Sequence, residues 1–184
     1  MRPRVVARLA GLALLAVAGD AAAGCSDVPA PGVDYGRCQL DGTDLAGVDL
    51  TGGDLRYASF KRADLTGAVL VDVRARKAKF VSATLADSRF DGASLVETDF
   101  TRADLRGVSF EGANLYRTRF FRADLRGADL TGAQLRDTDF LNARLDGATW
   151  VDGETTCAEG SIGRCTPARE PKADARAAPA AAGG

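Results

Sequence analysis

The sequence predicts an all-β solenoid with four sides, and three observations lead to this fold class. A bulky apolar residue recurs at every fifth position from Leu40 to Trp150, with 14 Leu, seven Phe and one Trp in 23 positions and only Ala75 interrupting. The residue two before each of these is small or β-branched, and is Ala at 13 of the 23 positions. Sorted by position modulo 20, five of the seven phenylalanines share one column: Phe60, Phe80, Phe100, Phe120 and Phe140.

A period of five residues fits neither a helix nor a flat sheet. A helix advances about 100° per residue and would spread these positions around its circumference, and a strand would turn successive Leu to opposite faces. A chain that turns after every five residues and sends two of the five side chains inward satisfies the pattern. Identical side chains then stack at the inter-strand spacing of about 4.8 Å, which is a physical reason for the columns.

The units also resemble a known family. Residues 63–67 read ADLTG, and residues 103–107 and 123–127 both read ADLRG, which look like the A(D/N)LxX unit of pentapeptide-repeat proteins. The resemblance covers about residues 38–152 and implies a right-handed quadrilateral β-helix with four units per coil, so five to six coils in this chain.

The chain divides into five predicted segments. Residues 1–23 are a predicted signal peptide, because Arg2, Arg4 and Arg8 precede a short apolar run. Residues 24–37 form a linker and N-terminal cap, residues 38–152 the repeat β-helix, and residues 153–165 a C-terminal disulfide cap. Residues 166–184 form an Ala/Pro-rich tail with almost no large apolar residue to bury, which predicts disorder. No transmembrane segment is expected after the signal.

Four cysteines, an even number with no CxxC spacing, flank the repeat tract. Behind an export signal they favour disulfides, because thiols oxidise outside the cytoplasm. We predict the pairs Cys157–Cys165 and Cys25–Cys38, one at each end of the solenoid, and a secreted or extracytoplasmic location. An alternative remains, because Ala23-Gly24-Cys25 resembles the end of a lipoprotein box. Cys25 would then carry a lipid anchor, and the protein would be a cell-surface lipoprotein.

The composition argues against an enzyme. The chain has no histidine, which excludes Ser-His-Asp and Cys-His nucleophiles and histidine-dependent zinc sites. The repeated aspartates before the central Leu are expected to accept hydrogen bonds from the turn backbone, and no catalytic residue, cofactor or metal site is predicted.

Ala75, the one central position without a bulky residue, has two interpretations: the coil bulges there for a function, or the repeat unit has decayed.

The resemblance also implies an alternative function, because some pentapeptide-repeat proteins resemble B-DNA in size and charge and act on DNA gyrase. A DNA mimic acting on a DNA topoisomerase needs a strongly acidic rod inside the cell. Residues 38–152 instead carry 18 acids and 16 bases behind the signal. Nor does the bulk charge point to nucleic acid as a partner.

Charge is nevertheless unevenly distributed around the coil. When the residue immediately before each central residue and the two residues after it are assigned to that side, the sides built on 40, 60 and onward and on 55, 75 and onward are each +3, and the other two are −3 and −4. The simpler interpretation is that the charges keep the rod soluble and that their uneven distribution has no function. The sharper hypothesis is a scaffold or interaction module whose basic sides bind an anionic partner, such as a cell-wall polymer or an acidic protein. The candidate binding residues are Arg56, Tyr57, Arg76, Lys77, Tyr116, Arg117 and Arg136.

Self-association is expected to be limited to a monomer or a weak dimer. Phe121 and Leu141 each follow a core Phe and lie one predicted coil apart, so they form a small apolar spot on the surface.

Overall fold

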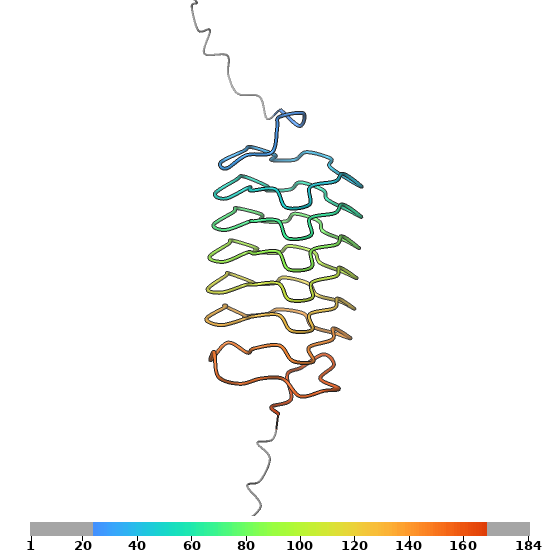
Figure 1. Cartoon of the computed structure of the whole chain (residues 1–184), viewed down its shortest axis with the longest axis vertical. Helices are drawn as coiled ribbons and strands as arrows, with labels where there is room; N and C mark the ends of the chain where they lie inside the picture. Colours follow the sequence, from blue (N-terminus) through green and yellow to red (C-terminus); the bar gives the residue numbers. More distant parts are fainter. Residues whose placement is uncertain (1–23, 169–184) are drawn as a thin grey trace, which may run out of the picture.

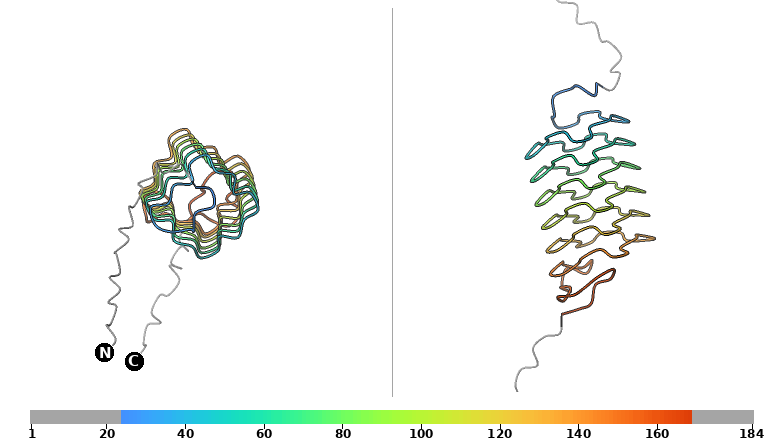
Figure 2. Two further views of the ribbon diagram at one scale, coloured as in Figure 1. Left: turned by 90° about the horizontal axis from the view of Figure 1, so that it is seen from above. Right: turned by 90° about the vertical axis from the view of Figure 1, so that its right-hand side faces the viewer.

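The computed structural model describes residues 24–168, which form a rod of stacked coils with a square cross-section (Figures 1 and 2). The predicted signal peptide, residues 1–23, and residues 169–184 of the predicted tail lie outside the described residues. None of the described residues belongs to a helix that could cross a membrane.

Pairing of the backbone at a fixed register of 20 residues builds the rod. Parallel bridges join each position to its equivalent 20 residues later, from Asp34 with Asp54 to Asp129 with Thr149. Each side of a coil contributes a single bridge residue, so the regular tract contains no longer strand and no helix among the described residues. The four-unit coil expected from the phenylalanine columns is therefore confirmed.

A turn follows every central residue and makes the corner between two sides. In this turn the amide of the third residue after the central one donates a hydrogen bond to the central carbonyl. The Cys38 amide, for example, donates to the Tyr35 carbonyl at 3.0 Å. The second corner residue has a positive φ at each position from Arg37 to Gly147, between 54° and 71°. This left-handed residue is the signature of a type II turn.

The four sides are numbered here by their central residues. Side 1 contains Leu40 and Phe60 to Phe140, side 2 begins at Leu45, side 3 at Leu50, and side 4 contains Tyr35, Leu55 and Ala75. Corner 4/1 joins side 4 to side 1, and corners 1/2, 2/3 and 3/4 follow in chain order. Sides 1 and 3 lie opposite each other across the core (Figure 2).

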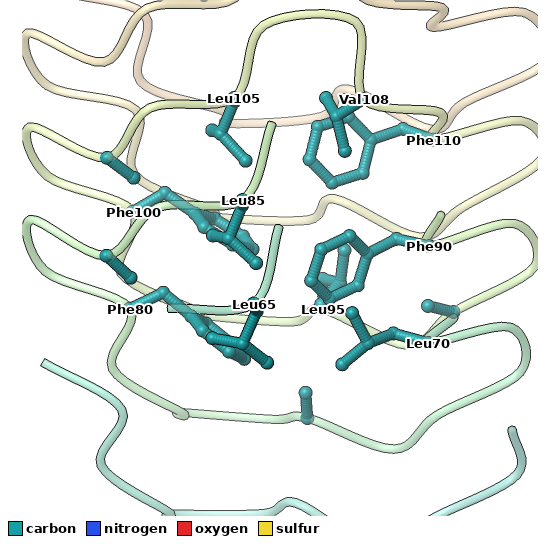
Figure 3. Packing of buried hydrophobic residues seen from close by; sticks show 14 of the residues in the cluster. Leu65, Leu70, Phe80, Leu85, Phe90, Leu95, Phe100, Leu105, Val108 and Phe110 are labelled. Carbon is teal, nitrogen blue, oxygen red and sulfur yellow. The ribbon is translucent and has the colours of Figure 1, made fainter. Parts of the chain in front are cut away.

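The core is a set of side-chain columns. On side 1 the rings of Phe60 to Phe140 stack nearly parallel, with centroids 5.0–5.3 Å apart from one coil to the next. Phe90 and Phe110 on side 3 meet them edge to face at 5.6–5.9 Å. Leu65, Leu85 and Leu105 form a further column beside the rings (Figure 3). Aromatic pairs in these geometries add to the burial of their area.

Threonine replaces alanine at three inward positions, where its hydroxyl bonds the backbone of the previous coil. The hydroxyls of Thr98, Thr118 and Thr138 donate to the carbonyls of Ala75, Leu95 and Leu115 at 2.7–2.8 Å. Each bond joins residues 23 apart and so ties one coil to the previous one. No buried side-chain polar atom in residues 24–168 lacks a partner.

The regular turns begin at Pro31, inside the segment that was predicted as linker and cap. Asp34 pairs with Asp54, and Tyr35 is buried as the first central residue of side 4. The Tyr35 hydroxyl donates to the Asp27 carbonyl at 2.7 Å, which holds the chain before it over the core. The predicted Cys25–Cys38 disulfide is present and joins that chain to the first coil.

At the other end the chain folds back antiparallel. Thr156 pairs with Thr149 and Ile162 with Arg144, so the returning chain covers the edges of sides 3 and 2. The predicted Cys157–Cys165 disulfide is present in this segment. The C-terminal return pairs with the last edges of sides 2 and 3, which would otherwise be open to pairing with other chains.

Ala75 does not make the coil bulge. Its amide donates to the Ser94 carbonyl at 2.9 Å, and the Lys77 amide donates to Val96 at 3.0 Å, as in neighbouring coils. Val73, the inward residue before it, is larger than the Ala at that place in the following coils and fills part of the missing volume. The decayed-unit interpretation fits this regular backbone.

Ala75→Leu is expected to raise the free energy of unfolding by about 1 kcal/mol, the low end for filling a core gap, because Val73 occupies part of the space. Urea unfolding measures it. The control is Ala78→Leu, at a packed inward position, which is expected to destabilise by about 1–3 kcal/mol through overpacking. Equal destabilisation by both would show that no gap exists at Ala75.

Candidate functional site

The left-handed corner positions divide the rod into two halves. On corners 2/3 and 3/4 these positions are glycine except for Asp72 and Asp87. On corners 4/1 and 1/2, the two corners that flank side 1, only Gly42 is glycine. Eleven side chains therefore occupy left-handed positions beside side 1: Arg37, Tyr57, Arg62, Lys77, Ser82, Glu97, Arg102, Arg117, Arg122, Asp137 and Asn142.

Available space does not account for this division. A Cβ added at Gly47, Gly52 or Gly67 would meet nothing within 4 Å, and among the corner glycines only Gly92 and Gly107 would bring it against a side chain, so most glycine corners have room for side chains. A left-handed conformation costs a residue other than glycine roughly 1–2 kcal/mol. The chain thus retains eleven of its thirteen left-handed side chains on the half of the rod that flanks side 1, and strain concentrated in this way is a signal of function.

Those side chains belong to a strongly basic surface. We define the basic face as the outward residues of side 1 and of its two flanking corners. It carries twelve bases and five acids, a net charge of +7. The bases are Arg37, Arg56, Lys61, Arg62, Arg76, Lys77, Lys79, Arg102, Arg117, Arg119, Arg122 and Arg136, and the acids are Asp41, Glu97, Asp99, Asp137 and Asp139.

All seven predicted binding residues lie on corner 4/1, and ion pairs hold four of them. Arg56 pairs with Asp54 at 2.5 Å, Arg76 and Lys77 both approach Glu97 at 3.4 Å, and Arg117 reaches Asp137 at 3.8 Å. These cations keep 43–58 % of their side chains exposed. The pairs position the cations and leave them open to a ligand.

Aromatic rings order other arginines of the basic face. The guanidiniums of Arg117 and Arg136 lie 4.8 and 4.6 Å from the Tyr116 ring centre, which holds the two cations together. Arg37 lies 5.9 Å from the Tyr57 ring centre. On corner 1/2, Arg122 lies 5.0 Å from that of Phe121. Phe121 is thereby partly covered, whereas Leu141 is 60 % exposed.

Corner 1/2 contains cations that the sequence-based choice of binding residues missed. Arg62, Arg102 and Arg122 are exposed, and within residues 24–168 none of them has a carboxylate within 4.0 Å. Their signal in the sequence is a charged residue at the corner position where glycine is expected. Lys79 on side 1 is likewise without an ion pair in this part of the chain.

Shallow grooves between coils open beside corner 4/1. One is lined by Asp34, Gly36, Arg37, Asp54, Arg56 and Tyr57, a second by Lys77, Lys79, Arg117, Arg119 and neighbours, and a third by Asn114, Tyr116, Gln134 and Arg136. Two carboxylates line each of the first two grooves, Asp34 and Asp54 in the first and Glu97 and Asp99 in the second, whereas the third has only amide, aromatic and cationic groups, which suit an anionic ligand. Among residues 24–168, no group of three metal-ligating side chains is placed to hold an ion.

Asp54 anchors the upper part of corner 4/1. Its side chain is only 8 % exposed and accepts hydrogen bonds from Arg56 Nε at 2.8 Å and from the Arg56 backbone amide at 3.1 Å. Arg74 approaches the same carboxylate at 3.3 Å. The hydrogen bonds from Arg56 lower the pKa of Asp54 below its ordinary value, although burial raises it.

The structure defines a β-solenoid of five-residue units, and sequence comparison identifies its family. A family described as "Pentapeptide repeat region" matches residues 43–120, and one described as "Pentapeptide repeats (8 copies)" matches residues 113–149. The chain belongs to the pentapeptide-repeat family. The right-handed quadrilateral β-helix is the fold of this family.

Solved structures with the same repeat cover half to two thirds of the chain. A pentapeptide repeat protein from Nostoc PCC 7120 is 32% identical over 50% of this chain and 69% of its own, with a TM-score of 0.43. One from the Arabidopsis thaliana thylakoid lumen is 28% identical over 60% and 67%, with a TM-score of 0.26. QnrB1, a plasmid-mediated fluoroquinolone resistance protein, is 19% identical over 64% and 72%, with a TM-score of 0.37. No curated protein matches the sequence.

Asp54→Asn is expected to lower the free energy of unfolding at neutral pH by about 1 kcal/mol, because the Arg56 amide and the largely exposed guanidiniums of Arg56 and Arg74 lose a charged acceptor. The folded pKa of Asp54 is depressed, so its stabilisation is present above the unfolded value of about 3.9 and is lost as the pH falls through the folded value. The difference between wild type and variant should therefore narrow below about pH 3.9 in urea unfolding. Asp34→Asn, at an exposed carboxylate, is the control. A difference independent of pH would contradict the assignment.

Arg62→Gly, Arg102→Gly and Arg122→Gly are each expected to raise the free energy of unfolding. Relief of about 1–2 kcal/mol of left-handed strain exceeds the entropic penalty of glycine, about 0.5–1 kcal/mol. Thermal unfolding of the single variants measures the effect. Thr101→Gly changes the first residue of a corner, where φ is not positive, and should destabilise. Destabilisation by all four would show that the corner arginines make a stabilising contact.

Proposed function

We propose that the chain is a non-enzymatic interaction module that works outside the cytoplasm and docks an anionic cell-surface partner on its basic face. Pentapeptide-repeat proteins are generally non-enzymatic structural or interaction proteins. The observation that carries the proposal is the net charge of +7 on side 1 and its corners, to which six bases at strained left-handed positions contribute. A flat surface of this kind attracts an extended anion through many charge-assisted contacts.

The cysteines support the proposed location. The disulfides Cys25–Cys38 and Cys157–Cys165 close both ends of the rod, and disulfides persist in oxidising compartments. A Cys25 sulfur bonded to Cys38 has no valence left for a lipid, so the disulfide favours secretion over the lipid-anchored alternative. The absence of a membrane-spanning helix in residues 24–168 is compatible with this location.

The charge distribution favours this function over DNA mimicry. A DNA mimic presents carboxylates to a protein that normally binds phosphates. On side 2, Asp104 and Asp124 are instead paired with Arg106 and Arg126 at 2.6 Å. The repeat tract as a whole is close to neutral, with 18 acids and 16 bases, and half of its surface is basic, so it offers little resemblance to a rod of phosphates.

Expression of the full chain in a bacterial host tests both parts of the proposal by cell fractionation. The protein should be found outside the cytoplasm, bound to envelope material at low salt and released as salt screens the charges. Lys79→Glu/Arg102→Glu/Arg136→Glu lowers the basic face from +7 to +1 and should release the protein into the medium.

The matched control is Arg106→Glu/Arg126→Glu/Arg144→Glu, which makes the same change in net charge outside the basic face and should leave retention intact. Accumulation of the wild type in the cytoplasm would refute the location. Equal retention of the two triple variants would refute docking on the basic face.

A further inference from the structure

The side of the rod opposite the basic face is acidic. We define the acidic face as the outward residues of side 3 and of corners 2/3 and 3/4. It carries eight acids and three bases, a net charge of −5. The acids are Asp49, Asp72, Asp87, Asp91, Glu111, Asp129, Asp146 and Asp152, and the bases are Arg89, Arg106 and Arg126.

The three bases of the acidic face neutralise fewer of its carboxylates than the net charge of −5 implies, because two of them pair with residues of side 2. Arg106 and Arg126 pair with Asp104 and Asp124 of side 2, at 2.6 Å each. Within residues 24–168, Asp72, Asp87 and Glu111 are exposed and have no cation within 4.0 Å. Free carboxylates thus line one side of the rod while free guanidiniums line the other.

The two faces also differ in relief. Ten of the twelve left-handed positions on the acidic face are glycine, although its corners still carry Asp72, Asp87 and first corner residues such as Arg106. The left-handed positions of the basic face carry side chains at eleven of twelve positions, such as Arg62, Arg102 and Arg122. The basic face therefore projects more corner side chains than the acidic face does.

Both faces repeat at the same interval, because both belong to one solenoid. Stacked rings set that interval at 5.0–5.3 Å per coil. Charges on two rods lying side by side therefore stay in step along their length. A second copy of this chain has the repeat, the charge and the flat shape that the basic face requires.

We propose that rods of this protein associate side by side, with the basic face of one on the acidic face of the next. The contact joins two different surfaces, so each added rod leaves one basic and one acidic face open and the array extends. The role of this association in the cell rests on the proposed function, that is, on docking of the basic face to an anionic surface. A rod docked on an anionic surface by its basic face presents its acidic face outward, and this new anionic surface recruits the next copy.

Analytical ultracentrifugation of the purified chain tests the association. At about 0.01 M salt, where charges act over about 30 Å, the weight-average mass should exceed twice that of the monomer and rise with concentration. At about 1 M salt it should fall to the monomer value. A monomer at both salt concentrations would overturn the proposal.

Two variants, each of which removes three charges, identify the faces. Arg62→Gly/Arg102→Gly/Arg122→Gly lowers the basic face from +7 to +4, and Asp72→Gly/Asp87→Gly/Glu111→Gln lowers the acidic face from −5 to −2. Each variant alone should be monomeric at low salt. Mixed together they should form a one-to-one dimer and nothing larger, because one intact basic face meets one intact acidic face.

Association of either variant alone, or no dimer in the mixture, would overturn the assignment of faces. Failure here is distinguishable from failure of the proposed function. The acidic-face variant keeps the whole basic face, so it should still bind envelope material. Retention on the envelope without association of the wild type would refute only the lateral contact.

Discussion

Parallel backbone pairing at a register of 20 residues is the constraint on which the rest of this structure depends. Because each residue lies over its equivalent one coil later, side chains at equivalent positions of successive coils stack in a column. Phenylalanines form a continuous stack, threonine hydroxyls bond the previous coil, and charges accumulate on particular sides. The same register that stabilises the core therefore also concentrates charge on the surface.

The turn that closes each unit links stability to surface chemistry. Its second residue must be left-handed, and glycine satisfies this requirement with least strain. One half of the rod uses glycine at ten of twelve such positions and the other at one of twelve. The half with glycines has little left-handed strain in its backbone. The half flanking side 1 has more of this strain, which lowers the free energy of unfolding, and carries projecting side chains at the same positions. Such an exchange is common where a protein binds a partner.

The ends of a solenoid need their own solution, because coils stop there with unpaired edges. At the first coil, Tyr35 fills the core and Cys25–Cys38 joins the preceding chain to it. At the last coil, the chain reverses and pairs antiparallel, and Cys157–Cys165 closes the reversal. Between these two ends, the four long sides offer continuous surfaces for interaction.

The sequence by itself determined the solenoid, its four sides, its core columns and both disulfides, because each depends on residues that repeat every five or twenty positions or on cysteines at the ends of the tract. Only the tertiary structure decided that the coils begin at Pro31, that Thr98 bonds Ala75, and that Arg56 is held by Asp54. It also decided which cations act together. A corner belongs to two sides, and the sequence assigned each corner only to the side before it. Folding places corner 4/1 beside side 1, which unites charges that the sequence had divided.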